Sequence, residues 1–187
     1  MTTIVVARKG RSIAIAADSL ISFGETRYSS DDDTQQKIIG IGDSLIGMSG
    51  SAAHFDVLKR VLSSMEKPCF RSRDAIFDTF LHAHSVLKEK YFLNTKEEDD
   101  DPYESSQITA LIANTSGVYG VYSYREVFEF DRFWAIGSGR NYALGAMHAV
   151  WDSAKNATTV AEAGVRAGIE FDKSSGGSVR THTLKIR

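Results

Sequence analysis

The sequence predicts a single α+β domain in which two β-sheets pack face to face between outer helices, a four-layer αββα sandwich. Three observations predict this fold. The elements follow one another as strands, two helices, strands, two helices and a last strand. The 187 residues are enough to bury a substantial core, so we expect one domain over 1–187. Alanines at Ala14, Ala16 and Ala17 would let the two sheets approach closely.

The first half of the chain begins with strands and continues with helices. Branched or alternating apolar residues mark the strands, and apolar side chains at helical spacing mark the helices. The predicted elements are strands 4–6 and 13–17 around a turn at Gly10, strands 37–39 and 44–48 around Gly42, and helices 51–65 and 72–92.

The second half repeats this order after a charged segment, 96–104, which predicts a solvated loop. Thr159 and Glu162 have the spacing of a capping box that starts the last helix. The predicted elements are strands 107–114, 117–123 and 126–130, a glycine turn at 137–139 leading into a helix up to 151, a helix from Thr159 to about Phe171, and a closing strand over 178–186.

Composition and charge exclude several classes of function. The formal net charge of −2 provides no basic surface for nucleic acid. The only cysteine, Cys69, cannot form an internal disulfide and suits a reducing compartment. No signal peptide is visible, and no window approaches the roughly 20 apolar residues of a membrane helix. We therefore expect a cytoplasmic protein without a nucleic acid or membrane partner.

The sequence contains no pattern for a metal or a cofactor. His82 and His84 lie two residues apart on a predicted helix and face different directions. No HExxH or paired-cysteine spacing occurs. The glycine turn at 137–139 lacks the Lys-Ser/Thr of a phosphate-binding loop, so it predicts a turn or a site shaped for the chain's own backbone. We expect neither a metal nor a cofactor.

The amino terminus is the strongest candidate for chemistry. Removal of Met1 would expose the α-amine of Thr2, whose reference pKa is about 7.7 to 8.0. A neutral amine beside the Thr2 hydroxyl combines a nucleophile and a general base in one residue. Asp18, at the end of the second strand, lies beside the first strand and would hold Lys37 charged, which favours the Thr2 alkoxide. On Asp18 and Lys37 alone, a surface ion pair is the alternative.

With these residues identified, the chain resembles the proteasome β subunit and HslV, which are N-terminal-nucleophile threonine peptidases. The resemblance covers essentially the full length. The matching motifs are T-T-I-V-V at 2–6, A-A-D-S at 16–19, Lys37, G-S-A-A at 50–53, G-S-G at 137–139 and D-x-x-S-G-G at 172–177. The sequence departs from the family at His54, where an aspartate is usual, and in longer loops at 24–36 and 96–104.

The resemblance implies the N-terminal-nucleophile hydrolase fold and a threonine endopeptidase. It implies roles for residues beyond Thr2, Asp18 and Lys37: an oxyanion-binding amide at Gly50, residues that orient the amine at Ser138, Asp172 and Ser175, and a specificity pocket lined by Ile21, Met48 and Ala52.

The resemblance also implies a particle. We expect a barrel-shaped compartmental protease, a double-ring homo-oligomer of twelve or fourteen subunits that degrades polypeptides and is fed by an AAA+ unfoldase. Two alternatives stay open: a catalytically silent ring particle that retains Met1, and a small-molecule amidase that uses the same nucleophile. The mass of the amino terminus and the assembly state distinguish them.

Overall fold

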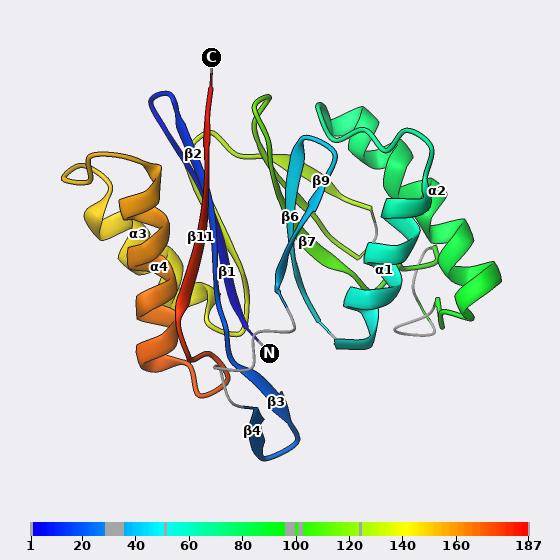
Figure 1. The fold of residues 1–187 in the computed structure, drawn as a ribbon, viewed down its shortest axis with the longest axis horizontal. Coiled ribbons are helices and arrows are strands. Elements are labelled where there is room, and N and C mark those ends of the chain that lie inside the picture. Colours follow the sequence, from blue (N-terminus) through cyan, green and yellow to red (C-terminus); the bar gives the residue numbers. More distant parts are fainter. Residues whose placement is uncertain are drawn as a thin grey trace.

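A computed structural model describes residues 2–28, 36–50, 52–95, 100, 103–123 and 125–186. Met1, Ser51 and most of the charged segment 96–104 lie outside these residues, so the predictions made for them are not addressed by the structure. Within the described residues, two β-sheets lie between two helical layers, the four-layer α+β architecture that the element order predicts (Figure 1). No helix among them is long and apolar enough to span a membrane.

The first sheet has the strand order β10-β1-β2-β11 and is antiparallel throughout. Its strands are β1 (Thr3–Lys9), β2 (Ser12–Asp18), β10 (Phe133–Gly137) and β11 (Val179–Lys185). The predicted hairpin around Gly10 is confirmed, and Gly10 has a φ of 60°. The strand β10 was not predicted, because its short apolar run carries no period that separates a strand from a buried helical turn.

The second sheet has the order β5-β6-β7-β8-β9. Its strands are β5 (Ile38–Ile41), β6 (Ser44–Ser49), β7 (Thr109–Ala113), β8 (Val118–Val121) and β9 (Val127–Glu129). A separate hairpin of β3 (Ile21–Phe23) and β4 (Thr26–Tyr28) projects below the sheets near the amino terminus (Figure 1). This hairpin was not predicted, because its three-residue strands are too short to show alternation.

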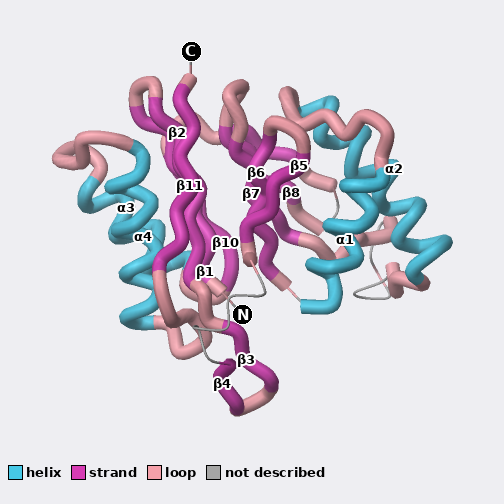
Figure 2. Tube along the Cα trace, viewed as in Figure 1, coloured by secondary structure: helices cyan, strands magenta, loops and turns pink. Residues whose placement is uncertain are grey.

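Two helices cover each outer face of the sandwich (Figure 2). The helices α1 (Ala52–Ser64) and α2 (Arg73–Tyr91) lie on the second sheet, and α3 (Arg140–Val150) and α4 (Ala157–Phe171) lie on the first. The predicted start of α4 at Thr159 is wrong. Asn156 caps the helix, and its side chain accepts a hydrogen bond from Thr159 N–H at 2.9 Å, because asparagine is at least as strong a cap as threonine.

The interior consists of three apolar layers, and strand alternation assigns side chains to them. Ile4, Val6 and Ala17 lie between the sheets, whereas Ala14 and Ala16 lie under the helices. The small side chains at Ala14 and Ala16 therefore make room for helices, which corrects the predicted role in sheet contact. A glycine serves the sheets instead: a Cβ on Gly47 would lie 2.7 Å from Ile4 Cγ2.

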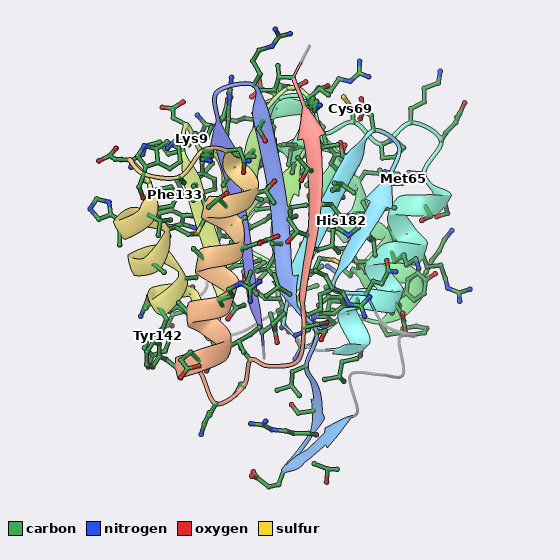
Figure 3. All side chains as sticks on the ribbon, turned by 60° about the vertical axis from the view of Figure 1, so that its left-hand side comes forward. Lys9, Met65, Cys69, Phe133, Tyr142 and His182 are labelled. Carbon is green, nitrogen blue, oxygen red and sulfur yellow. The ribbon has the colours of Figure 1, made fainter. Side chains whose placement is uncertain are left out.

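The strand β1 has a different environment at each end. At its carboxyl end, Lys9 and Phe133 lie on the helix-covered side, and both contact the Trp151 ring (Figure 3). At its amino end, Thr2 and Thr3 are buried polar residues. Buried polar side chains require hydrogen-bond partners. We therefore expect a cluster of polar groups, and with it the candidate site, at the amino end of β1.

Candidate active site

Thr2 and Asp18 meet where β1 and β2 pair. Ile4 is the register partner of Ala17, so Asp18 at the end of β2 lies beside the residues that begin β1. Thr2 is 3% exposed, and its hydroxyl donates a hydrogen bond to Asp18 Oδ1 at 2.6 Å. The expectation that Asp18 lies beside the amino terminus is confirmed.

Lys37 reaches the same carboxylate from the second sheet. It precedes β5, and its carbonyl accepts the Met48 N–H of β6 at 3.3 Å. Its Nζ donates to Asp18 Oδ1 at 2.8 Å, and 11% of its side chain is exposed. Burial lowers the pKa of Lys37 below its ordinary value, although the neighbouring Asp18 opposes the change.

Asp18 organises the site through both carboxylate oxygens. It is 1% exposed, and five hydrogen-bond donors surround it. The donors to Oδ1 are Thr2 Oγ1, Thr3 N–H and Lys37 Nζ, and the donors to Oδ2 are Leu20 N–H and Gly176 N–H. A carboxylate held by donors on both oxygens has one orientation, so Thr2 and Lys37 are positioned relative to each other.

A second polar cluster lies near the Thr2 carbonyl oxygen. Asp172 Oδ2 accepts the hydroxyl of Ser138 at 2.6 Å and that of Ser175 at 2.7 Å. Ser138 Oγ also lies 3.4 Å from the Thr2 carbonyl oxygen. Partial burial favours a higher pKa for Asp172, but the hydrogen bonds from Ser138 and Ser175 outweigh it and lower the pKa. The three residues expected to act together are brought together.

The glycine turn before α3 is shaped by the first residues of the chain. Gly137 has a φ of 89°, and a Cβ there would lie 2.1 Å from the Thr2 carbonyl oxygen. Gly139 N–H points at the same oxygen from 3.4 Å. The turn therefore contacts the chain's own backbone, as the sequence analysis expects.

The remaining predicted residues lie near this centre or at its edge. Gly50 follows β6 with a φ of 136°, a conformation that residues with a side chain rarely adopt. Ile21 is half-buried on β3, and Met48 is buried in the layer beneath α1 and α2. Ala52 is the first residue of α1, and its side chain is outside the description. Their proposed roles in oxyanion and substrate binding remain predictions.

A cavity of about 270 Å³ opens beside the Asp18–Lys37 pair. Its walls come from the end of β2, from residues 36–38 and from β11, including Arg180 and His182. The described residues include no group of His, Cys, Asp and Glu side chains that could hold a metal ion.

One polar residue of this centre, Thr3, was not predicted from the sequence. Thr3 is fully buried, and its hydroxyl lies 2.7 Å from Ser175 Oγ. A usable signal was present, because Gly164 and Gly168 lie four residues apart on a helix, and glycines inside a helix often mark close packing. A Cβ on Gly168 would lie 2.3 Å from Thr3 Oγ1.

Comparisons with known proteins agree with this geometry. The family model described as proteasome subunit matches residues 1–184. A proteasome subunit beta of Nanoarchaeum equitans (strain Kin4-M) is 26% identical over 192 residues, which span 98% of this chain and 93% of that protein.

Solved structures give the same result. Thiobacillus denitrificans BPH is 38% identical with a TM-score of 0.92, covering 99% of this chain and 98% of that one. Its complex with epoxomicin has a TM-score of 0.91 at 38% identity and covers 99% of both chains. HslV from Trypanosoma brucei, at 18% identity, covers 98% of this chain and 99% of that one with a TM-score of 0.72, and shares the fold.

Proposed function

Because the chain belongs to the proteasome subunit family, we propose that it is a threonine endopeptidase subunit of a barrel-shaped compartmental protease. One observation carries the proposal: Thr2 Oγ1 and Lys37 Nζ both donate to the same buried oxygen of Asp18. A hydroxyl beside a buried ammonium–carboxylate pair is placed for nucleophilic catalysis.

The proposed reaction begins with removal of Met1. The freed Thr2 amine takes the proton of the Thr2 hydroxyl, directly or through a water molecule, and the oxygen attacks a peptide carbonyl carbon. The Gly50 N–H stabilises the tetrahedral oxyanion. The amine product leaves with the transferred proton, and water then hydrolyses the threonine ester.

The surrounding polar groups have separate roles in this reaction. Lys37, held by Asp18, stabilises negative charge that develops on Thr2 Oγ1. Ser138, Asp172 and Ser175 orient the Thr2 backbone and its amine, which is supported by the contacts that Ser138 and Gly139 make with the Thr2 carbonyl.

Two forms of the protein test the nucleophile. One is cleaved so that Thr2 is the first residue, and the other carries an uncleavable residue before it. We expect the first form to hydrolyse fluorogenic peptides and to gain the mass of a threonine-directed epoxyketone, and the second form to do neither. Equal turnover by both would contradict Thr2 as the nucleophile. Inactivity of both would favour a silent ring particle.

We further propose that the subunits form a closed double ring of twelve or fourteen copies that receives polypeptides from an AAA+ unfoldase. The family membership supports the ring, since closed symmetry confines the active sites. Native mass spectrometry measures the number of subunits. A monomer at micromolar concentration would favour a small-molecule amidase instead.

A further inference from the structure

The residue after the nucleophile has a polar side chain at a position where packing alone favours an apolar one. Side chains alternate along β1, and the helix-facing positions that follow Thr3 are Val5 and Ala7, both in the apolar layer under α3 and α4. Thr3 is 0% exposed. A buried hydroxyl without a partner is destabilising, so the partner of Thr3 indicates why a threonine is there.

The single proton of each hydroxyl fixes the direction of the hydrogen bonds among Thr3, Ser175 and Asp172. The Thr3 and Ser175 hydroxyl oxygens are 2.7 Å apart, and either could be the donor. Ser175 donates to Asp172 Oδ2 at 2.7 Å, and a hydroxyl carries only one proton. Ser175 must then accept from Thr3. The hydrogen bonds run from Thr3 to Ser175 and from Ser175 to Asp172.

The helical layer leaves space for this hydroxyl at two points. A Cβ on Gly139, just before α3, would lie 2.0 Å from Thr3 Oγ1, and a Cβ on Gly168 of α4 would lie 2.3 Å from it. Both positions must lack a side chain for the hydroxyl to occupy its place. Two glycines from separate segments therefore leave the space that the Thr3 side chain occupies.

We propose that Thr3 is a positioning residue of the peptidase site: its hydroxyl fixes Ser175, and Ser175 in turn fixes the Asp172 carboxylate beside the Thr2 backbone. This inference rests on the proposed function. The Thr3 side chain touches none of the reacting atoms. It is buried under the helices, whereas the Thr2 hydroxyl is hydrogen-bonded to Asp18.

Three substitutions distinguish the contribution of the Thr3 hydroxyl to activity from that of its methyl group. Thr3→Val keeps the shape and loses the hydroxyl, Thr3→Ser keeps the hydroxyl, and Thr3→Ala loses both. With Met1 removal checked by intact mass, we expect kcat for a fluorogenic peptide to fall about tenfold in Thr3→Val and Thr3→Ala, the effect of one buried hydrogen bond. We expect Thr3→Ser to retain wild-type kcat, and KM to change in none of them, since Thr3 does not contact substrate.

A double substitution tests the route through Ser175. If Thr3 acts only through Ser175, Thr3→Val adds no further loss to Ser175→Ala. Additive losses would overturn the relay. Equal kcat in Thr3→Val and wild type, or equal losses in Thr3→Ser and Thr3→Ala, would overturn the role of the hydroxyl. An inactive wild-type protein with free Thr2 would overturn the proposed function as well. If the wild-type protein is active, a negative result overturns only the role of Thr3.

Discussion

Replacing Lys37 by methionine removes a charge from the centre while keeping an unbranched side chain of similar length. The Lys37 ammonium lies 2.8 Å from Asp18 Oδ1, with side-chain exposures of 11% and 0%. Because burial lowers the pKa of Lys37, the ammonium is already costly to hold, and Asp18 compensates for it with a smaller contribution from the charge of Asp172. We expect Lys37→Met to reduce both activity and stability.

The size of each effect follows from this geometry. At an effective dielectric constant near 20, two charges at this separation attract by about 6 kcal/mol before desolvation is counted. Breaking a buried ion pair costs about 3 to 5 kcal/mol of folding free energy. Since Asp18 keeps four other donors, we expect the loss at the lower end, about 3 kcal/mol. The kcat/KM should fall at least about 100-fold, as for the loss of other preorganised electrostatic groups.

The assay measures kcat/KM with a fluorogenic peptide, the unfolding temperature and the native mass on the same preparation. A matched control is Lys88→Met, which removes the exposed ion pair with Glu104 and should leave both the unfolding temperature and the activity close to those of wild type, because solvent screens such a pair. An assembled Lys37→Met protein whose kcat/KM stays within threefold of wild type would refute the electrostatic role of Lys37.

Two further predictions concern Asp172 and the substrate. The pKa of Asp172 is lower in the folded protein than its ordinary value of 3.8, so its charge stabilises the fold above that pH, and this stabilisation is lost as pH falls through the folded pKa. The unfolding temperature of Asp172→Asn should therefore fall less steeply than that of wild type between about pH 5 and pH 3. Peptides with a bulky apolar residue on the acyl side should be cleaved fastest, since Ile21, Met48 and Ala52 carry no charge. A peptide panel that shows preference for acidic or basic side chains would contradict this pocket.

Local patterns were sufficient for much of the fold. The β1–β2 hairpin follows from two apolar runs around Gly10, a residue with positive φ, and the helices α1 and α2 begin and end within a residue or so of their predicted limits. Patterns failed where an element was short, as in β10 and the β3–β4 hairpin. They also failed where two caps competed, as at Asn156 and Thr159.

The sequence by itself determined which residues were candidates for chemistry. An N-terminal threonine, an aspartate that ends an apolar strand, and the motifs at 137–139 and 172–177 are visible in the chain without any coordinates. Composition was also informative, because a single cysteine excluded an internal disulfide before any fold was known.

Only the tertiary structure decided which atoms meet. Asp18 ends β2 of the first sheet and Lys37 precedes β5 of the second, so the meeting of Thr2 and Lys37 at Asp18 Oδ1 depends on how the sheets stack, and Gly47 permits the close approach of the sheets. The hydrogen bond between Thr3 and Ser175 joins residues 172 positions apart in the sequence, and it depends on the close packing of α4, at Gly168, against Thr3. Hydrogen bonds between such distant residues leave no periodic trace in the sequence, because periodicity records only the faces of single elements.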